Sequence, residues 1–318
     1  MTPQTRGLLA LIATGVMWGV FPLYFNHLRA VPPVELLAHR VLWTAVGYVL
    51  LLIASGRGAE ISALLRGGER RRVAAAAALI AVNWGVFIWA VNSGHAIDGS
   101  LGYYIFPLVA VLFGVVFRGE RPGAAAWLAI ALAALGVAVL TWGLGVPPWV
   151  ALILAVSFGL YGLIKTGIRA RAEVSVAAEA LILAPLALGW LVFVWASGWQ
   201  GGLHFGRESL QSLMVMAMGV ITGLPLILFT YGSQRLRLST VGMVLYLNPT
   251  LQAAIAVTAL GESLTRWHLA AFALIWAGLA VYSAALIAAE RRASSVGTSA
   301  TVVVKSSIEA SAKPSPTT

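Results

Sequence analysis

Long apolar runs separated by short polar loops dominate the chain. Ten runs of 17 or more mostly apolar residues lie at 7–24, 34–53, 73–91, 101–117, 123–142, 148–164, 175–196, 210–229, 241–260 and 267–289. A helix of about 20 residues rises about 30 Å, which matches the hydrocarbon core of a bilayer. The runs are continuously apolar rather than alternating, so they predict helices and not barrel strands. The pattern predicts an all-α integral membrane protein with ten transmembrane helices.

Basic residues are distributed unequally between the two sets of loops. Loops on the side of the N-terminus hold 17 of the 21 Lys and Arg residues, whereas the opposite loops hold three, namely Arg29, Arg207 and Arg266. Because cytoplasmic loops of membrane proteins are enriched in Lys and Arg, both termini are expected in the cytoplasm. Residues 291–318, rich in Ser, Thr, Ala, Pro and Lys, are expected to form a disordered cytoplasmic tail.

Composition excludes several classes of protein. Hydrophobic residues make up 60% of the chain and charged residues 10%, whereas soluble domains carry about 25% charged residues. The net charge of +10 lies in short clusters between apolar runs, which argues against a nucleic-acid partner. Cysteine is absent, Asp98 is the sole aspartate, and neither a His-Glu-x-x-His motif nor a P-loop occurs. We therefore expect no enzyme, no cofactor and no metal site.

The chain repeats itself at a spacing of about 140 residues. Pro107 corresponds to Pro249 and Gly136 to Gly278 at an offset of 142, and Gly19 corresponds to Gly159 at an offset of 140. Each copy holds five predicted helices, an odd number, so the second copy enters the membrane from the opposite side. Two inverted repeats, at 7–142 and 147–290, would place a solute site between the halves and permit alternating access.

Several stretches resemble one branch of a known family. They are residues 18–24 (WGVFPLY), 38–43 (AHRVLW), 83–84 (NW), 100–104 (SLGYY), 157–164 (SFGLYGLI) and 224–229 (LPLILF). The chain resembles the RarD branch of the EamA family, within the drug/metabolite transporter superfamily. The resemblance implies a bacterial inner-membrane permease of ten helices with two EamA repeats.

Arg40 is the most informative single residue. It lies about two turns into the second apolar run, where Arg costs about 2.5–3.5 kcal/mol on insertion scales. It is expected either to bind an anionic solute group or an ion-pair partner in a polar cavity, or to reach the outer interface by snorkelling. Asp98 is one candidate partner for Arg40 in one conformational state. Glu35 and His39 are four residues apart, and a pair at the helix end is the favoured interpretation.

Other polar and aromatic residues recur in the first, second, third, fourth, sixth, eighth and ninth runs, but hardly in the fifth and tenth. The predicted substrate-binding residues are Trp18, Arg40, Asn83, Tyr103, Tyr104, Tyr161, Tyr231, Asn248 and Gln252. Pro107 and Pro249 are expected to kink their helices, because proline removes a backbone hydrogen bond. Trp84 is a further candidate for stacking on a flat solute.

Three acidic residues and one lysine have structural alternatives. Glu120 and Glu262 follow the same glycine in each repeat and are expected to cap the next helix start. Lys165 is explained by the inner basic cluster, and Glu179 is either an intramembrane acid or a residue near a helix end. The sequence predicts a secondary-active transporter of small metabolites or drug-like solutes, with proton or other ion coupling left open. The alternatives are a non-transporting sensor or scaffold and an intramembrane enzyme.

Overall fold

The computed structural model describes residues 2–119, 121, 123–233, 235–236, 244–285 and 287–288. These residues form helices joined by short connections, and no strand occurs among them. The predicted tail at 291–318 lies outside the described residues. The helices are α1 (Pro3–Gly19), α2 (Phe21–His27), α3 (Pro33–Ala54), α4 (Gly58–Arg66), α5 (Arg70–Asn92), α6 (Ala96–Arg118), α7 (Ala124–Leu144), α8 (Trp149–Lys165), α9 (Ala172–Ser197), the short 3-10 turn η1 (Trp199–Gly201), α10 (Ser209–Ser233), α12 (Leu247–Thr258) and a last helix (Arg266–Ala285).

Eight helical segments of the described chain are long and apolar enough to cross a bilayer. They are Pro3–His27, Pro33–Ala54, Arg70–Asn92, Ala96–Arg118, Ala124–Leu144, Ala172–Ser197, Ser209–Phe229 and Arg266–Ala285. Helix α8 is apolar but has 17 residues, and α12 has 12 described residues. The all-helical membrane architecture is confirmed, and the count of ten spans stays a prediction.

Local sequence signals explain where several helices begin and end. Pro3 occupies the first turn of α1, and the Thr2 side chain accepts a hydrogen bond from the Thr5 amide, which is the usual N-cap arrangement. Helix α6 ends at Gly119, whose φ of 65° lies in the left-handed region that glycine adopts without strain.

The first membrane span is broken between α1 and α2, close to Pro22. Proline has no backbone N–H, so the Trp18 carbonyl loses the donor that an unbroken helix would supply four residues later. The side-chain amide of Gln252 on α12 donates to that carbonyl oxygen instead, at 3.2 Å. The break therefore joins the first span to a helix far away in the sequence.

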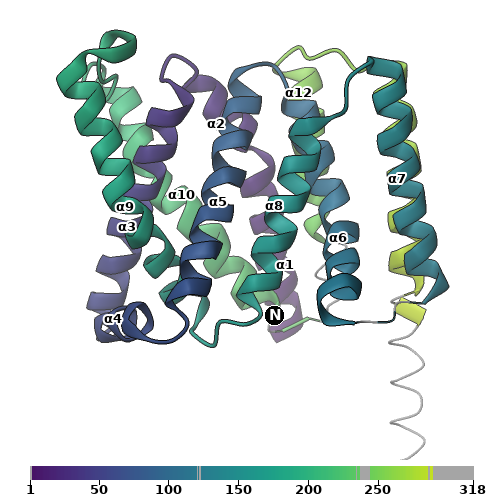
Figure 1. The fold of residues 1–318 in the computed structure, drawn as a ribbon, viewed down its shortest axis with the longest axis horizontal. Coiled ribbons are helices and arrows are strands. Elements are labelled where there is room, and N and C mark those ends of the chain that lie inside the picture. Colours follow the sequence, from purple (N-terminus) through teal and green to yellow (C-terminus); the bar gives the residue numbers. More distant parts are fainter. Residues whose placement is uncertain are drawn as a thin grey trace, which may run out of the picture.

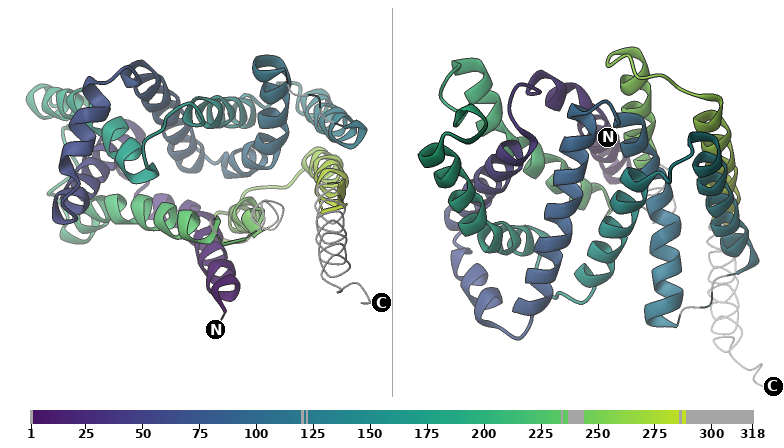
Figure 2. Two further views of the ribbon diagram at one scale, coloured as in Figure 1. Left: turned by 90° about the horizontal axis from the view of Figure 1, so that it is seen from below. Right: turned by 45° about the horizontal axis from the view of Figure 1, so that its top comes forward.

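The spans stand side by side, and α7 lies at one edge of the bundle with the last helix behind it (Figure 1). The left panel of Figure 2 shows the same pair side by side from below, at the edge of the bundle. A Cβ on Gly136 would lie 3.2 Å from the Ala271 carbonyl oxygen, so small residues allow α7 and the last helix to approach closely. As their Ala- and Leu-rich sequences predicted, neither helix contributes to the central cavity described below.

Glu262 caps a helix, but not the one that follows it. Its two carboxylate oxygens accept hydrogen bonds from the Ala96 and Ile97 amides at 2.7 and 2.8 Å, so Glu262 closes the N-terminus of α6. The prediction that Glu262 caps the helix that follows it was therefore wrong. The chain folds Glu262 back onto α6, and it caps that helix instead. Burial raises the pKa of the Glu262 carboxyl, against the lowering effect of these two amides. Glu120 lies outside the described residues.

Candidate functional site

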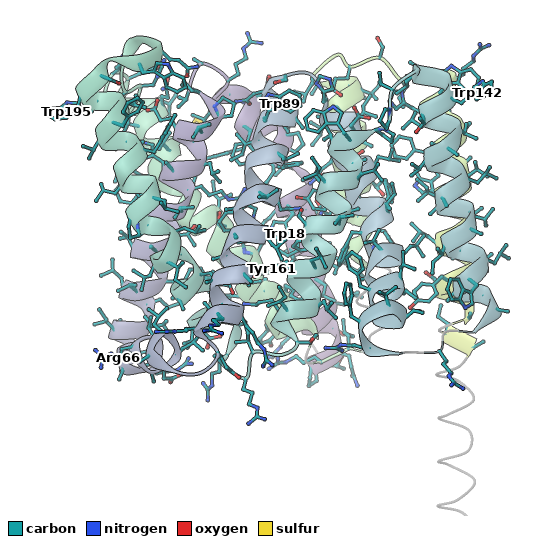
Figure 3. All side chains as sticks on the ribbon, in the orientation of Figure 1. Trp18, Arg66, Trp89, Trp142, Tyr161 and Trp195 are labelled. Atoms are coloured by element: carbon teal, nitrogen blue, oxygen red, sulfur yellow. The ribbon has the colours of Figure 1, made fainter. Side chains whose placement is uncertain are left out.

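A cavity of about 160 Å3 lies among helices from both halves of the chain. Its walls are mostly aromatic and aliphatic, with a few polar groups. The lining residues are Trp18, Phe21, Arg40, Ile80, Asn83, Trp84, Phe87, Tyr103, Phe158, Tyr161, Val176, Glu179, Ala180, Leu183, Thr222, Leu226, Asn248 and Gln252. Figure 3 places Trp18 and Tyr161 about midway between the two ends of the bundle. A largely apolar cavity with a few convergent polar groups is the usual form of a small-molecule site.

Arg40 is buried at the wall of this cavity rather than extended to the surface, with 5% of its area exposed. Its Nε donates to the Thr222 hydroxyl on α10 at 3.2 Å, and its guanidinium carbon lies 4.1 Å from the centre of the Trp84 ring. Such cation–π contacts compensate part of the desolvation of a buried charge. Among the described residues, no carboxylate oxygen lies within 4.0 Å of the guanidinium. The charge of Arg40 is therefore not neutralised by an ion pair in this part of the chain.

Asn83 is a buried amide that ties three helices together beside the cavity. Its Nδ2 donates to the Leu154 carbonyl and the Ser157 hydroxyl of α8, both at 3.1 Å. Its Oδ1 accepts from the Tyr103 hydroxyl of α6 at 3.0 Å. Since a buried amide needs its partners, this network fixes the orientation of Asn83 and Tyr103 in the wall.

At another part of the wall, α1 and α12 meet through Gln252. Its Nε2 donates to the Asn248 side-chain oxygen at 2.8 Å as well as to the Trp18 carbonyl. The Oε1 of Gln252 is buried and has no hydrogen-bond partner among the described residues. An unsatisfied buried acceptor costs about 1–3 kcal/mol, so this oxygen is an unpaired polar group next to the cavity.

Lys165 and Glu179 form an ion pair at the cavity wall that the sequence did not assign to the site. The Lys165 Nζ lies 2.6 Å from Glu179 Oε1, and the Tyr161 hydroxyl donates to Glu179 Oε2 at 3.1 Å. The Ser175 hydroxyl also lies 2.8 Å from Oε1. Glu179 is 3% exposed, and Lys165 belongs to this pair as well as to the basic residues on the side of the N-terminus. The spacing of Tyr161 and Lys165 by four residues was the available signal, because it places both on one face of α8.

The structure places seven of the nine predicted binding residues on the cavity wall and two elsewhere. Tyr104 follows Tyr103 by one residue, so it points about 100° away around the helix. It contacts the last helix, with its ring packed edge-on against Trp276, and its hydroxyl lies 2.5 Å from the Thr250 hydroxyl. Tyr231 lies near the C-terminal end of α10, where it is 37% exposed and covered by the guanidinium of Arg235.

The two prolines predicted to kink their helices occupy different positions. Pro107 lies inside α6, which continues on both sides of it. Pro249 lies in the first turn of α12 as described, where a missing N–H leaves no hydrogen bond unmade. Neither proline lines the cavity. The helix break near Pro22 does lie at the cavity, since Trp18 and Phe21 beside it are both lining residues.

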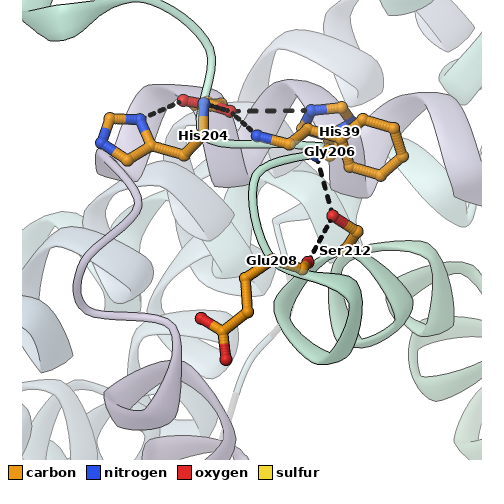
Figure 4. A network of polar contacts seen from close by, with 7 residues as sticks. His39, His204, Gly206, Glu208 and Ser212 are labelled. Atoms are coloured by element: carbon orange, nitrogen blue, oxygen red, sulfur yellow. Dashed lines mark hydrogen bonds and ion pairs between the residues drawn. The ribbon is translucent and has the colours of Figure 1, made fainter.

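Glu35 anchors the loop between α9 and α10 to the start of α3 (Figure 4). One carboxylate oxygen accepts from the His204 and Phe205 amides at 2.8 and 3.0 Å, and the other lies 3.0 Å from His204 Nδ1. His39 is 4.0 Å from the carboxylate and packs against the Phe205 ring. Glu35 and His39 therefore lie close together at the helix end as predicted, but the main hydrogen-bond partner of Glu35 is this loop.

Asp98 is not a partner of Arg40 in this structure. It faces His268, whose Nε2 lies 3.6 Å from the Asp98 carboxylate. Both residues line a second cavity between α6, the loop before α8 and the last helix. Among the described residues, no group of three or more acidic, His or Cys side chains is arranged to hold a metal ion.

Known proteins resemble this chain over most of its length. An uncharacterized transporter of Pseudomonas aeruginosa is 43% identical over 281 residues, which is 87% of this chain and 93% of the relative. Protein RarD of Salmonella typhi is 40% identical over 292 residues, covering 91% and 98%. A protein of known crystal structure superimposes with a TM-score of 0.58 at 24% identity, over 86% of this chain and 96% of its own, and supports the fold.

The family model of the EamA-like transporters matches residues 5–142. Together with the relatives, this match identifies the family to which the multi-pass membrane architecture belongs. The chain is a member of the EamA family of membrane transporters, in its RarD branch, within the drug/metabolite transporter superfamily.

Proposed function

We propose that the chain is a secondary-active transporter that moves small organic anions across the bacterial inner membrane by alternating access. The observation that carries the proposal is Arg40, a buried cation at the wall of a central cavity with no described carboxylate beside it. A charge kept inside a membrane protein marks a solute or ion pathway by default.

The lining indicates the chemistry of the solute. The Arg40 guanidinium donors that have no hydrogen-bond partner among the described residues match a carboxylate or phosphate, which an arginine binds through two parallel hydrogen bonds. Trp18, Trp84 and Phe158 provide flat apolar surfaces around the same space. We infer a substrate with one anionic group on a flat or apolar body, whether a metabolite or a drug-like solute.

Contacts between helices support the two inverted repeats at 7–142 and 147–290. The repeat equates α1 with α8, α5 with α10 and α6 with α12. Helix α1 packs against α10 and α12, and α8 packs against α5 and α6, as a two-fold relation requires. A Cβ on Gly19 would meet Leu251, and one on the equivalent Gly159 would meet Val109. Leu251 and Val109 are themselves 142 residues apart.

The two edge helices repeat this relation. Gly136 of α7 faces the Ala271 carbonyl, and Gly278 of the last helix faces the Ala129 carbonyl. Adding 142 to Gly136 gives Gly278, and adding 142 to Ala129 gives Ala271. Each helix therefore presents equivalent residues to the other. In transporters, repeats related by an axis in the membrane plane rock against each other around a shared site.

We further propose that the N-terminus and the basic loops face the cytoplasm. The N-terminus and Arg66 lie at the same end of the bundle, whereas Trp89, Trp142 and Trp195 lie toward the other (Figures 1 and 3). The end with the N-terminus carries the loops that hold most of the Lys and Arg residues. A cysteine introduced at Ser62 in α4 should then react from the cytoplasm only.

Comparing metabolites tests the proposed activity and identifies the solute. Cells that overproduce the wild-type chain should differ from cells that lack it in the amount of one or a few organic anions inside and outside the cell. Cells that produce Arg40→Ala at the same level should resemble the deletion. If the protein were a sensor or scaffold, these differences in solute amounts would not appear. A difference confined to cations or neutral solutes would contradict the assignment of an anionic substrate.

A further inference from the structure

The carboxylate of Glu179 is the one acidic group on the described wall of the central cavity. Lys165 and Ser175 contact its Oε1 and Tyr161 its Oε2, which leaves one lone pair of Oε2 without a partner among the described residues. The group is thus buried, bound to donors from α8 and α9, and still adjacent to the space that a solute would occupy.

The described charges at the cavity do not balance when Lys165, which contacts Glu179 but does not itself line the cavity, is included. Lys165 and Glu179 neutralise each other, and Arg40 adds a positive charge that has no carboxylate near it. An empty cavity thus carries one net positive charge, and a monoanion would neutralise it. If the Glu179 carboxylate accepts a proton, its negative charge disappears and the ammonium of Lys165 loses its counter-ion. Lys165 and Arg40 then both attract an anion.

We propose that Glu179 carries the proton that couples transport, and that the proton and the anionic solute bind together rather than in competition. This inference rests on the proposed function and assigns its coupling ion. A proton from the aqueous side binds one carboxylate oxygen of Glu179, and the same proton leaves to the other side when the cavity opens there. The anion held by Arg40 adds negative charge near Glu179, which favours that proton.

Coupling of this kind is reciprocal, so a proton that strengthens anion binding is itself bound more tightly when the anion is present. Co-transport follows from the signs of the charges. A cationic solute would instead compete with the proton for the carboxylate, and competition gives exchange. A sodium ion is a poorer candidate, because the ammonium of Lys165 already occupies the position of a cation at 2.6 Å.

Other charged groups around Glu179 are engaged elsewhere. Helix α9 packs against α3, α4 and α5. On α9 itself, Glu173 binds Arg57 at 2.7 Å, and Arg57 also binds Glu60 of α4. Tyr48 of α3 and Tyr161 of α8 contribute phenols, which are neutral at physiological pH. From α5, Arg72 donates to the Gly167 carbonyl. Lys165 and Arg40 therefore remain the charges that respond to protonation of Glu179.

Infrared difference spectra of the purified full chain in lipid, recorded between neutral and acidic pH, test the proposal without knowledge of the natural solute. The wild type should show the stretching band of a buried protonated carboxyl group. The band should be absent from Glu179→Gln and from the charge-balanced double variant Glu179→Gln/Lys165→Met, which keeps the site free of an unpaired lysine. It should persist in Glu173→Gln, the matched change on the same helix.

Benzoate then serves as the anionic probe. It should strengthen proton binding at Glu179 by about 5–150-fold, the range typical of coupled sites, and Arg40→Gln should remove this effect. Absence of a Glu179-dependent band, or a band that benzoate leaves in place or moves to lower pH, would overturn the proposal. If Arg40→Ala abolishes solute movement but the wild type shows no Glu179-dependent band, the assignment of the proton to Glu179 fails and the proposed function stands. If Arg40→Ala transports normally, the proposed function itself fails.

Discussion

Replacing Arg40 by Ala should reduce transport of the organic anion to the background of cells without the protein. The guanidinium is the one cation on the described cavity wall that no carboxylate neutralises. A hydrogen bond to a charged group contributes about 1.5–3 kcal/mol, so losing it should weaken solute binding by about 10–150-fold. Arg40→Lys keeps the charge but loses the planar fork, and it should retain only a small part of the activity.

Two controls separate this effect from misfolding. Arg29 lies exposed after α2, and Arg29→Ala removes a surface arginine without touching the cavity, so it should transport normally. Membrane yield and thermal unfolding of the Arg40 variants should stay near those of the wild type. Normal uptake or export by both Arg40 variants would show that the cavity charge serves packing and not the solute.

Gly219→Ala should lower the stability of the protein, because the added methyl group would collide with the backbone of a neighbouring helix. The Cβ would collide with the Trp43 carbonyl oxygen and lie 2.7 Å from its carbonyl carbon. Backbone atoms cannot rotate away as a side chain can, so α3 and α10 must separate. Overpacking of this kind costs about 1–3 kcal/mol, and thermal unfolding in detergent should show a melting temperature several degrees lower.

Gly189→Ala on α9 is the matched control, because no atom lies within 4 Å of the Cβ it would add. It should leave the melting temperature unchanged or raise it slightly, since Ala favours helix over Gly by about 0.5–1 kcal/mol. Equal effects of the two substitutions would contradict the close contact between α3 and α10. That contact also positions Arg40, whose Nε reaches Thr222 one turn along α10 from Gly219.

The apolar runs predicted the helices well, because a bilayer allows few alternatives to a helix of about 20 residues. They predicted the edge helices too, since α7 and the last helix contain almost no polar residues. The break at Pro22 was harder to interpret. Its effect depends on Gln252, more than 200 residues away, and no local pattern shows that pairing.

The cavity was predicted in part for a similar reason. A polar residue in an apolar run reveals that it needs a partner, but not which one, so Tyr103 and Tyr104 could not be told apart without the rotation of α6. The sequence did not assign the seventh apolar run, 175–196, to the cavity wall. Its lining residues Val176, Ala180 and Leu183 are as apolar as residues that face lipid. Lys165 looked like part of the inner basic cluster, and only the folded chain brings this last residue of α8 within reach of Glu179 on α9.

The absence of cysteine from the chain makes single-cysteine labelling the most direct test of alternating access. Leu183→Cys places one thiol on the cavity wall, and Leu186→Cys places one on the same helix at a side chain that is 74% exposed on the outside of the bundle. Ser62→Cys and Glu208→Cys, both exposed and at opposite ends, calibrate the two sides. Membrane-impermeant thiol reagents are applied separately from inside and outside.

If the cavity opens alternately, the thiol at position 183 should react from either side, and the anionic solute should slow both reactions. The thiols at positions 62 and 208 should each react from one side only, position 62 from the cytoplasm, and position 186 should be unaffected by the solute. Reaction of position 183 from one side alone under all conditions, or from neither side, would contradict a cavity that opens alternately across the membrane.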